Sequence, residues 1–548
     1  PTMLHALTRG LRQSASRAPP AASIRSRALS ELKCMSRYSN IDEAVQRYPL
    51  TKMVCTIGPV SEDAKTLQSL VTEGLRVMRI NFSHATFEEA TLRMKNLRNS
   101  KGFHGGAFNM RSVMLDTQGP EIRTGKLEGD PNERKRKVQL TMGDMITLTT
   151  NPEYREKGNK DMLWISYENL CQSVEVGSSI LFDDGLIELV VTDIGSDTVT
   201  CKIMNSGLLG EKKGVNLPGA SVDLPALTEK DKTDIRFGIE NDIDFIAASF
   251  VRTGKCVKEI KAFVEEVHAE FWPESHPVPG IISKIENQEA LRNIDSIIDE
   301  SYGIMVARGD LGVEIPYENV TLAQKEMIYR CQKIGKPVIV ATQMLESMQG
   351  NPRPTRAEVS DVTNAVIDGA DCVMLSGESA NGKYPLESVK ALGSIAVQAD
   401  KHVAFTQGKS VAETYMSTED MTNIEALAYS AVRACEEIKA ACIIVMTSTG
   451  KTAKFLSKFR PSVPIMAYVD NAKIGRQLIM HRGVHPLLFK RKEGGDSPDI
   501  AVQRAIEFGF CKEGDNVLVL QSMMNNGVFD VAMRIRKVGE TSDSSVVL

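Results

Sequence analysis

The sequence has few of the features that mark a membrane protein, a nucleic-acid-binding protein or a disulfide-bonded secreted domain. Its apolar runs all fall short of the roughly 18–20 residues that a membrane-spanning helix needs, so we expect no membrane contact. Basic residues are not in excess, since 66 Lys and Arg face 70 Asp and Glu for a net charge of −4, and nucleic acid is not an expected partner. The ten cysteines contain no CxxC pair, which favours a reducing compartment without disulfides. The eight histidines show no metal-ligand spacing.

What is present is a long chain with a large apolar content and an unusual beginning. The 548 residues are 42% hydrophobic, enough for three or four domains with a sizeable core. No acidic residue precedes Glu31, and that stretch contains five arginines: Arg9, Arg12, Arg17, Arg25 and Arg27. This composition predicts a mitochondrial or plastid transit peptide over residues 1–36. The alternatives are a disordered basic tail, or translation from Met35 and a cytoplasmic protein.

From Lys52 onward, short apolar runs alternate with helix-length amphipathic segments such as Ala64–Glu73 and Leu322–Ile334. Strands buried on both faces of a parallel sheet have this apolar character. The runs are Met53–Ile57, Leu75–Phe82, Ser112–Asp116, Ile243–Phe250, Gly280–Ile285, Gly303–Ala307, Pro337–Ala341 and Asp371–Leu375. Eight strands separated by helices predict an α/β fold, a (β/α)8 TIM barrel.

The fifth and sixth runs end in charged residues whose chemistry suits a phosphate-bearing substrate. Lys284 and Glu286 close the fifth run on one side of the strand, because side chains alternate, and Asp310 follows the sixth. Two carboxylates make a hard oxygen site suited to Mg²⁺, and the lysine would face a phosphoryl group beside it. A structural ion-pair network is the alternative for any one of these residues.

Polar residues follow the other strands as well. In a TIM barrel the catalytic face lies at the C-terminal ends of the strands, where such residues would collect. They are Arg79, Asn81 and Ser83 after the second strand, Asp116, Thr117, Glu121 and Arg123 after the third, Ser249 after the fourth, Gly309 after the sixth, Thr342 after the seventh, and Ser376 with Glu378 after the eighth. The sequence therefore predicts one active site built from many strand ends.

The chain between the third and fourth strands is too long for a loop, and its character changes. Residues 120–222 show β-branched alternation and turn pairs such as Asp184-Gly185, which predict a small all-β domain inserted in the barrel. Its flanks carry Arg123, Lys212 and Lys213. A domain hinged beside a catalytic face would act as a lid that excludes water from phosphoryl transfer.

A third pattern begins after about residue 400 and predicts a C-terminal α/β domain with a mostly parallel sheet. Its first strand-to-helix turn offers hydroxyls, backbone N–H groups and a lysine at a helix N-terminus, where an anion would bind well. The turn consists of Thr447, Ser448, Thr449, Gly450, Lys451 and Thr452. Ordinary capping by Ser and Thr explains the same residues without a ligand. The predicted domains after the transit-like extension are residues 37–119 and 223–400 for the barrel, 120–222 for the lid and 401–548 for the C-terminal domain.

Long motifs in this order resemble those of the pyruvate kinase family. They are TKMVCTIGP (51–59), VMRINFSH (77–84), MLDTQGPEIRTG (114–125), KKGVNLPGA (212–220), IISKIEN (281–287), MVARGDLGVEIP (305–316), ATQMLESM (341–348), PRPTRAEVSDV (352–362) and MLSGESANGKYP (374–385). The resemblance covers about Lys52 to Asp400 and continues more weakly beyond. It implies an enzyme of the last step of glycolysis, usually a homotetramer, that converts phosphoenolpyruvate and ADP to pyruvate and ATP with Mg²⁺ (or Mn²⁺) and K⁺.

The resemblance also implies roles for single residues. Glu286 and Asp310 match the Mg²⁺ ligands. Lys284 matches the lysine that stabilises the transferred phosphoryl group, and Arg79 the arginine that holds the substrate phosphate. The N–H groups of Gly309 and Asp310 would hold the substrate carboxylate beside Thr342, which lies near the carbon to be protonated. Because a threonine is a weak acid, we expect a water relay through Thr342, Ser376 and Glu378. The K⁺ site matches Asn81, Ser83, Asp116 and Thr117, and the nucleotide contacts match Asn81, His84, Arg123 and Lys213.

Other positions bear on regulation and on alternatives. Glu121 matches the glutamate that accompanies K⁺ dependence in the family, whereas Gln118 replaces a common lysine. The turn at 447–452 is kept in outline, but QSMMNNGVFD (521–530) lacks the Trp and Arg of relatives that fructose 1,6-bisphosphate activates, so another phosphorylated effector, or none, is expected. An aldolase-type barrel enzyme would need the acid pair but no lid. A catalytically dead metabolite sensor would have lost Lys284, Glu286 or Asp310.

Overall fold

The computed structural model describes residues 49–102, 110–129, 136–406, 421–489, 498–525, 528–540 and 546–547. The chain divides into two compact units, Pro1–Tyr48 and Pro49–Leu548, and everything below concerns the second. The transit-like residues 1–36 lie outside the described residues. Within the described part, no helix has the length and apolar character needed to cross a bilayer.

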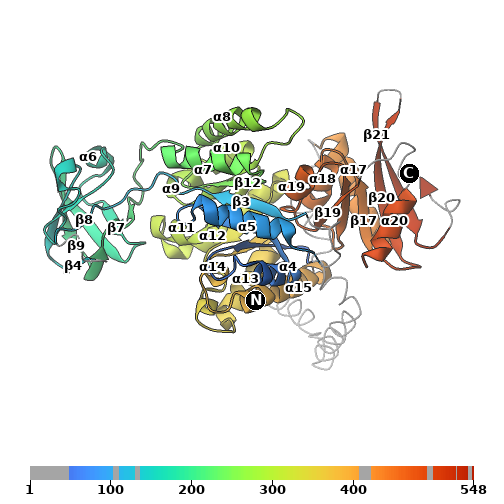
Figure 1. Ribbon diagram of the computed structural model, residues 1–548, viewed down its shortest axis with the longest axis horizontal. Helices are drawn as coiled ribbons and strands as arrows, with labels where there is room; N and C mark the ends of the chain where they lie inside the picture. Colours follow the sequence, from blue (N-terminus) through green and yellow to red (C-terminus); the bar gives the residue numbers. More distant parts are fainter. Residues whose placement is uncertain are drawn as a thin grey trace, which may run out of the picture. The chain divides into compact units, whose positions relative to one another are not determined.

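Eight parallel strands close into a barrel in the order β1-β16-β15-β14-β13-β12-β3-β2, which confirms the predicted TIM barrel (Figure 1). The strands are β1 (Lys52–Thr56), β2 (Leu75–Asn81), β3 (Ser112–Asp116), β12 (Phe245–Ala248), β13 (Gly280–Ile285), β14 (Gly303–Ala307), β15 (Val338–Ala341) and β16 (Cys372–Leu375). Almost all of their residues are buried, because the strands pack against helices outside and against one another inside.

The helices around the barrel are amphipathic and several begin at side-chain caps. Thr86, Thr228 and Thr355 each form a capping box that closes the first turn of α5, α7 and α13. The helices are α4 (Ala64–Thr72), α5 (Phe87–Asn99), α7 (Glu229–Glu240), α8 (Gly254–Phe271), α9 (Gln288–Arg292), α10 (Ile294–Glu300), α11 (Arg308–Glu314), α12 (Tyr317–Ile334), α13 (Arg356–Asp368), α14 (Gly377–Ala380) and α15 (Pro385–Thr406). The short α11 directly follows β14, so its first residues lie at the C-terminal ends of the barrel strands.

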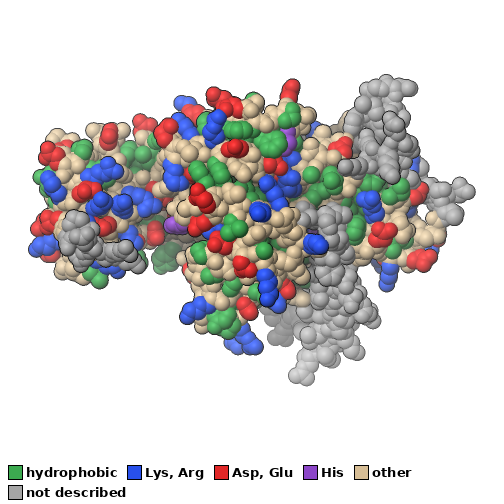
Figure 2. Space-filling model, in the orientation of Figure 1, with side chains coloured by type: hydrophobic (Ala, Val, Ile, Leu, Met, Phe, Trp, Pro, Cys, Tyr) green, Lys and Arg blue, Asp and Glu red, His purple; other side chains and the backbone are tan. Residues whose placement is uncertain are grey.

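The segment between β3 and β12 forms a β domain, here called the lid, with its own apolar core. It contains a β10-β4 pair and a sheet of order β11-β7-β8-β9-β5-β6. Its strands are β4 (Lys137–Leu140), β5 (Met145–Thr149), β6 (Met162–Trp164), β7 (Ser179–Phe182), β8 (Ile187–Ile194), β9 (Thr198–Ile203), β10 (Gly207–Gly210) and β11 (Val215–Asn216). The entering and leaving segments pair with each other, because Thr124 N donates to Lys213 O at 2.9 Å. Figure 2 shows acidic and basic side chains interspersed on the face that it draws.

The C-terminal domain is built on a sheet of order β19-β18-β17-β20-β21-β22 with helices beside it. Strands β17 to β20 are parallel to one another, as expected. Strand β21 is antiparallel to its two neighbours, β20 and β22. The strands are β17 (Cys442–Met446), β18 (Ile465–Val469), β19 (Val484–Leu488), β20 (Asn516–Asn525), β21 (Val528–Lys537) and β22 (Val546–Val547). The helices are α17 (Asn423–Glu437), α18 (Lys451–Lys458), α19 (Ala472–Leu478) and α20 (Pro498–Glu507).

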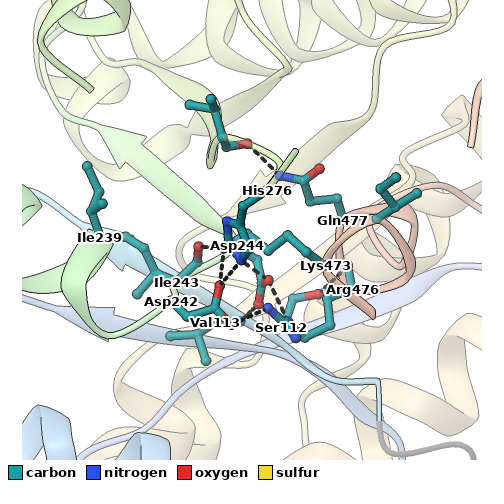
Figure 3. A network of polar contacts seen from close by, with 12 residues as sticks. Ser112, Val113, Ile239, Asp242, Ile243, Asp244, His276, Lys473, Arg476 and Gln477 are labelled. Atoms are coloured by element: carbon teal, nitrogen blue, oxygen red, sulfur yellow. Dashed lines mark hydrogen bonds and ion pairs between the residues drawn. The ribbon is translucent and has the colours of Figure 1, made fainter. Parts of the chain in front are cut away.

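An ionic network joins α19 to the start of β12 (Figure 3). Arg476 Nε lies 2.7 Å from Asp244 Oδ1, and Arg476 Nη2 lies 2.7 Å from Asp242 Oδ2. Lys473 Nζ lies 2.8 Å from Asp242 Oδ1. The second oxygen of Asp244 accepts the Val113 N–H of β3 at 2.8 Å. The C-terminal domain is therefore fastened to the N-terminal ends of two neighbouring barrel strands.

Candidate active site

Lys284 occupies the centre of a buried polar cluster at the C-terminal ends of β3, β12 and β13. Its Nζ donates to Ser249 Oγ at 2.8 Å and lies 2.8 Å from Glu286 Oε1 and 3.2 Å from Asp116 Oδ1. Burial alone would lower the pKa of Lys284, but the carboxylates of Asp116 and Glu286 outweigh it and raise that pKa. Lys284 is therefore a fixed cation at neutral pH, held in place before any substrate arrives.

Arg79 joins this cluster through Asp116. Arg79 Nε donates to Asp116 Oδ2 at 2.5 Å, and Arg79 Nη1 donates to Thr56 Oγ1 at 2.9 Å. Burial would raise the pKa of Asp116, but Arg79 and Lys284 reverse that effect and lower it. Asp116 is thus an ionised bridge between two cations that are both nearly enclosed.

Glu286 and Asp310 form an acid pair next to Lys284. Glu286 Oε2 accepts the Phe250 N–H at 2.6 Å, and the negative charge of Asp310 opposes the ionisation of Glu286 and so raises its pKa. Burial raises the pKa of Glu286 to about 7 and also raises the pKa of Asp310. Two adjacent carboxylates that are hard to ionise alone form a donor set that fits a divalent cation, which would favour their charged forms. In the part of the chain that is described, no group of three or more Asp, Glu, His and Cys is arranged for a metal; Mg²⁺ commonly uses one or two carboxylates and completes its shell with water and phosphate oxygens.

Thr342 lies where β15 ends and contacts the start of α11. Its Oγ1 accepts the Gly309 N–H at 2.8 Å and donates to Ala341 O at 2.6 Å. Thr342 has a φ of 67°, a left-handed conformation that is costly for a β-branched residue. Arg308 stabilises this backbone, since its Nη2 donates to Thr342 O at 2.7 Å. Sequence patterns did not single out Arg308, although a cation directly after a buried strand is a signal that points to it.

The four residues expected at the K⁺ site lie on the adjoining ends of β2 and β3. Asn81 and Asp116 are register partners in this strand pair. Asn81 Oδ1 accepts the Ser83 N–H at 3.1 Å, and Thr117 Oγ1 accepts the Ser249 N–H at 3.1 Å. The structure thus brings these oxygen-bearing residues to one corner of the cluster, next to Arg79.

A cavity of about 620 Å³ lies between the lid and the barrel. Its lining includes three of the expected nucleotide contacts, His84, Arg123 and Lys213, together with Asp310. Asn81, the fourth expected contact, does not line it. Two of the cationic side chains are held by acids of the lid and its hinge: Arg123 Nε donates to Glu121 Oε2 at 2.6 Å, and Lys213 Nζ lies 2.7 Å from Asp183 Oδ1.

The remaining relay candidates have backbone partners. Glu378 Oε2 accepts the Ser376 N–H at 2.8 Å, and its Oε1 accepts the Leu345 N–H at 3.1 Å. Glu378 is fully buried, so its visible task is to hold the loops that follow β15 and β16. Thr342 and Ser376 follow these neighbouring strands.

The expected anion turn of the C-terminal domain precedes α18. Thr447 Oγ1 accepts the Gly450 N–H at 3.0 Å, and Thr449 Oγ1 accepts the Lys451 N–H at 3.4 Å. Both hydroxyls therefore cap the turn itself, as the alternative to phosphate binding requires. The far loop, residues 521–530, falls largely outside the residues whose side chains are described.

Comparisons with known proteins place the chain in a family. The profile "Pyruvate kinase, barrel domain" matches residues 48–389, and "Pyruvate kinase, alpha/beta domain" matches residues 425–533. The chain belongs to the pyruvate kinase family. Human pyruvate kinase PKLR is 43% identical over 499 residues, which cover 89% of this chain and 85% of that protein. Pyruvate kinase 2 of Trypanosoma brucei brucei is 41% identical over 497 residues, with 88% and 95% covered.

A solved structure agrees with this assignment. The crystal structure of a pyruvate kinase from Cryptosporidium parvum superimposes with a TM-score of 0.82 at 38% identity, covering 90% of this chain and 97% of the other. The predicted enzyme class, a pyruvate kinase, is therefore confirmed, and the aldolase-type alternative is set aside. The sensor alternative required the loss of Lys284, Glu286 or Asp310, and all three are present in the cluster.

Proposed function

We propose that the Lys284 cluster carries the transfer of the phosphoryl group of phosphoenolpyruvate to ADP. The observation that carries this proposal is the position of Lys284 Nζ, which lies within 2.8–3.2 Å of Ser249, Glu286 and Asp116. A cation preorganised in a nearly closed site stabilises charge that develops on the transferred group. Arg79, anchored beside it by Asp116, holds the substrate phosphate.

Glu286 and Asp310 would hold Mg²⁺ (or Mn²⁺), which supplies charge neutralisation for the phosphoryl group and the enolate oxygen. The N–H groups of Gly309 and Asp310 at the start of α11 hold the substrate carboxylate, with Thr342 beside them. Thr342 then helps to deliver a proton to the enolate carbon through water. Because both oxygens of Glu378 bond backbone N–H groups, its part in this step is to keep Ser376 and the loop after Thr342 in place.

Arg123 and Lys213 at the lid hinge hold the phosphates of ADP, with His84 across the same cavity. Asn81, Ser83, Asp116 and Thr117 would hold K⁺, which would supply positive charge beside the substrate phosphate. From the resemblance we also propose a homotetramer, with either a phosphorylated effector at the turn 447–452 or no effector. From the composition of residues 1–36 we propose a mitochondrial or plastid location, or a cytoplasmic protein if translation starts near Met35.

The experiment is ATP formation from phosphoenolpyruvate and ADP with Mg²⁺, in K⁺ and then in Na⁺ buffer. We expect strong turnover in K⁺ and little in Na⁺. Lys284→Met should abolish turnover, whereas Lys255→Met, at an exposed helix position, should not change it. Full turnover by folded Lys284→Met would refute the role of Lys284, and equal rates in K⁺ and Na⁺ would refute the K⁺ site.

A further inference from the structure

The lid is hydrogen-bonded to α11, the barrel helix that carries Asp310 of the acid pair. Asn216 Nδ2, on β11 of the lid, donates to Glu314 Oε1 at 2.8 Å. Glu314 is the last residue of α11, the helix whose first turn contains Gly309 and Asp310. Both Asn216 and Glu314 line the cavity that Lys213 and Arg123 share with Asp310.

A second contact between the same two bodies involves a different part of the lid. The turn between β7 and β8 contains three consecutive residues with positive φ, ending at Gly185 with φ 82°. A Cβ added to Gly185 would lie 3.5 Å from Val313 Cγ1, so the turn backbone lies against α11 one residue before Glu314. Asp183 of this turn is the residue that holds Lys213 Nζ. The lid therefore meets the end of α11 through both β11 and the turn that positions a proposed nucleotide contact.

The surroundings make the hydrogen bond consequential. Glu314 is half-buried, and the desolvation that this causes raises its pKa, while the bond from Asn216 acts in the opposite direction. A half-buried carboxylate that loses its donor is left with an unmet desolvation cost, so the pair favours the arrangement in which lid and α11 touch. Because α11 is only 7 residues, about 10 Å long, a lid bonded to Glu314 is held close to Asp310.

We propose that Asn216 and Glu314 form a latch that sets the position of the lid relative to α11, and thereby the position of the nucleotide phosphates relative to the acid pair. Both are positioning residues: they act through Lys213 and Arg123 of the lid. This inference rests on the proposed nucleotide contacts at the lid hinge. The barrel face alone would hold phosphoenolpyruvate, and the latch would align ADP with it.

The test separates the two substrates. Asn216→Ala should raise KM for ADP and lower kcat by about tenfold each, the scale expected for one hydrogen bond to a charged group. KM for phosphoenolpyruvate should stay unchanged, because Arg79, Lys284 and Thr342 belong to the barrel. Glu314→Gln should retain most activity, since its amide oxygen still accepts from Asn216. The matched control is Ser179→Ala, which removes a hydrogen bond to Glu188 within the lid.

A double-mutant cycle and hydrogen exchange complete the design. The double variant Asn216→Ala/Glu314→Ala should lose no more activity than the more impaired single variant, because both substitutions remove the same hydrogen bond. Amide exchange of the full chain should quicken in residues 183–186 of Asn216→Ala and not of Ser179→Ala. Additive effects, an equal rise in both KM values, or unchanged exchange would overturn the latch. Failure of the wild-type enzyme to form ATP would instead refute the proposed function.

Discussion

Asp116 contacts Lys284 through Oδ1 at 3.2 Å and leaves Oδ2 for Arg79. One carboxylate therefore fixes the distance between two cations that would otherwise repel each other in a buried place. The arrangement places on a common anchor the arginine that we propose to hold the substrate phosphate and the lysine that we propose to stabilise the transferred phosphoryl group. Each cation keeps its remaining N–H donors for other partners. For Lys284, one of these partners is Glu286 of the acid pair.

Asp116→Asn tests this anchor. The amide keeps the shape of the side chain but removes its charge, so Arg79 and Lys284 repel each other and both shift. We expect kcat to fall by about 10²-fold, the scale of one electrostatic contact in a preorganised site, with a higher KM for phosphoenolpyruvate. Steady-state kinetics measure both, with Asp193→Asn on the lid surface as the control. A kcat within about twofold of wild type would contradict the anchoring role.

Arg476 is the second site where a charge is predicted to matter, in this case for stability. Arg476→Met leaves the buried Asp244 without its guanidinium partner, and truncating one member of such a pair costs about 3–5 kcal/mol. A lower Tm and a lower denaturant midpoint should follow. The exposed pair of Arg236 with Glu270 is the control, because exposed pairs contribute about 0–1 kcal/mol. Equal losses in Arg476→Met and Arg236→Met would refute the fastening role.

Lys52 gives a pH-dependent prediction. Burial, with Arg76 and Arg482 adding to it and Cys372 and Asp400 opposing it, lowers the pKa of Lys52 from 10.5 to about 7. Its Nζ lies 3.4 Å from His485 Nε2, across the contact with the C-terminal domain.

The unfolded chain keeps the proton of Lys52 up to about pH 10.5, while the folded chain loses it near pH 7. Stability therefore rises with pH between these values, since the unfolded state binds more protons there. Lys52→Met should be more stable than wild type by about 2–4 kcal/mol at pH 7, and the difference should shrink toward pH 10. Denaturant unfolding across this range measures it, with the exposed Lys255→Met as control. A difference independent of pH would show that Lys52 is charged throughout.

Gly450 and Gly514 allow a matched comparison of two Gly→Ala substitutions. Gly450 is the N-cap residue before α18 and has a φ of 77°, and a Cβ there would lie 2.9 Å from Leu478 Cδ2 of α19. Gly514 has a similar φ of 88° but open space around it. Both Ala variants suffer about 1–2 kcal/mol of backbone strain, and Gly450→Ala adds overpacking of about 1–3 kcal/mol. Thermal unfolding should rank Gly450→Ala clearly below Gly514→Ala, and equal Tm values would contradict the contact with α19.

The elements of the barrel could be predicted well where apolar runs are unbroken. Strands β13 and β14 have the predicted bounds, Gly280–Ile285 and Gly303–Ala307. Strand β12 was expected over 243–250 but spans Phe245–Ala248. Asp242 and Phe250 have φ values of 56° and 54°, so the backbone leaves the extended conformation on either side and the strand is shorter than the apolar run.

The candidate site could be predicted as a set of residues but not as a network of contacts. Strand order places Lys284, Glu286 and Asp116 at one face, and the alternation of side chains is a local property of the sequence. The anchoring of Thr342 by Arg308 depends on how β14 and β15 pair. The bond from Asn216 to Glu314 depends on how the lid meets α11, and no local pattern encodes that meeting.

The pairing of the segments that enter and leave the lid has a further consequence. Strands β3 and β12 are barrel neighbours although the whole lid separates them in sequence. Arg123 and Gly214 form a bridge, so the chain departs and returns at one point. The lid is thus an insertion with adjacent ends. A short turn joining these two positions would leave all eight strands of the closed barrel in place. The excised β domain would keep its own two ends side by side.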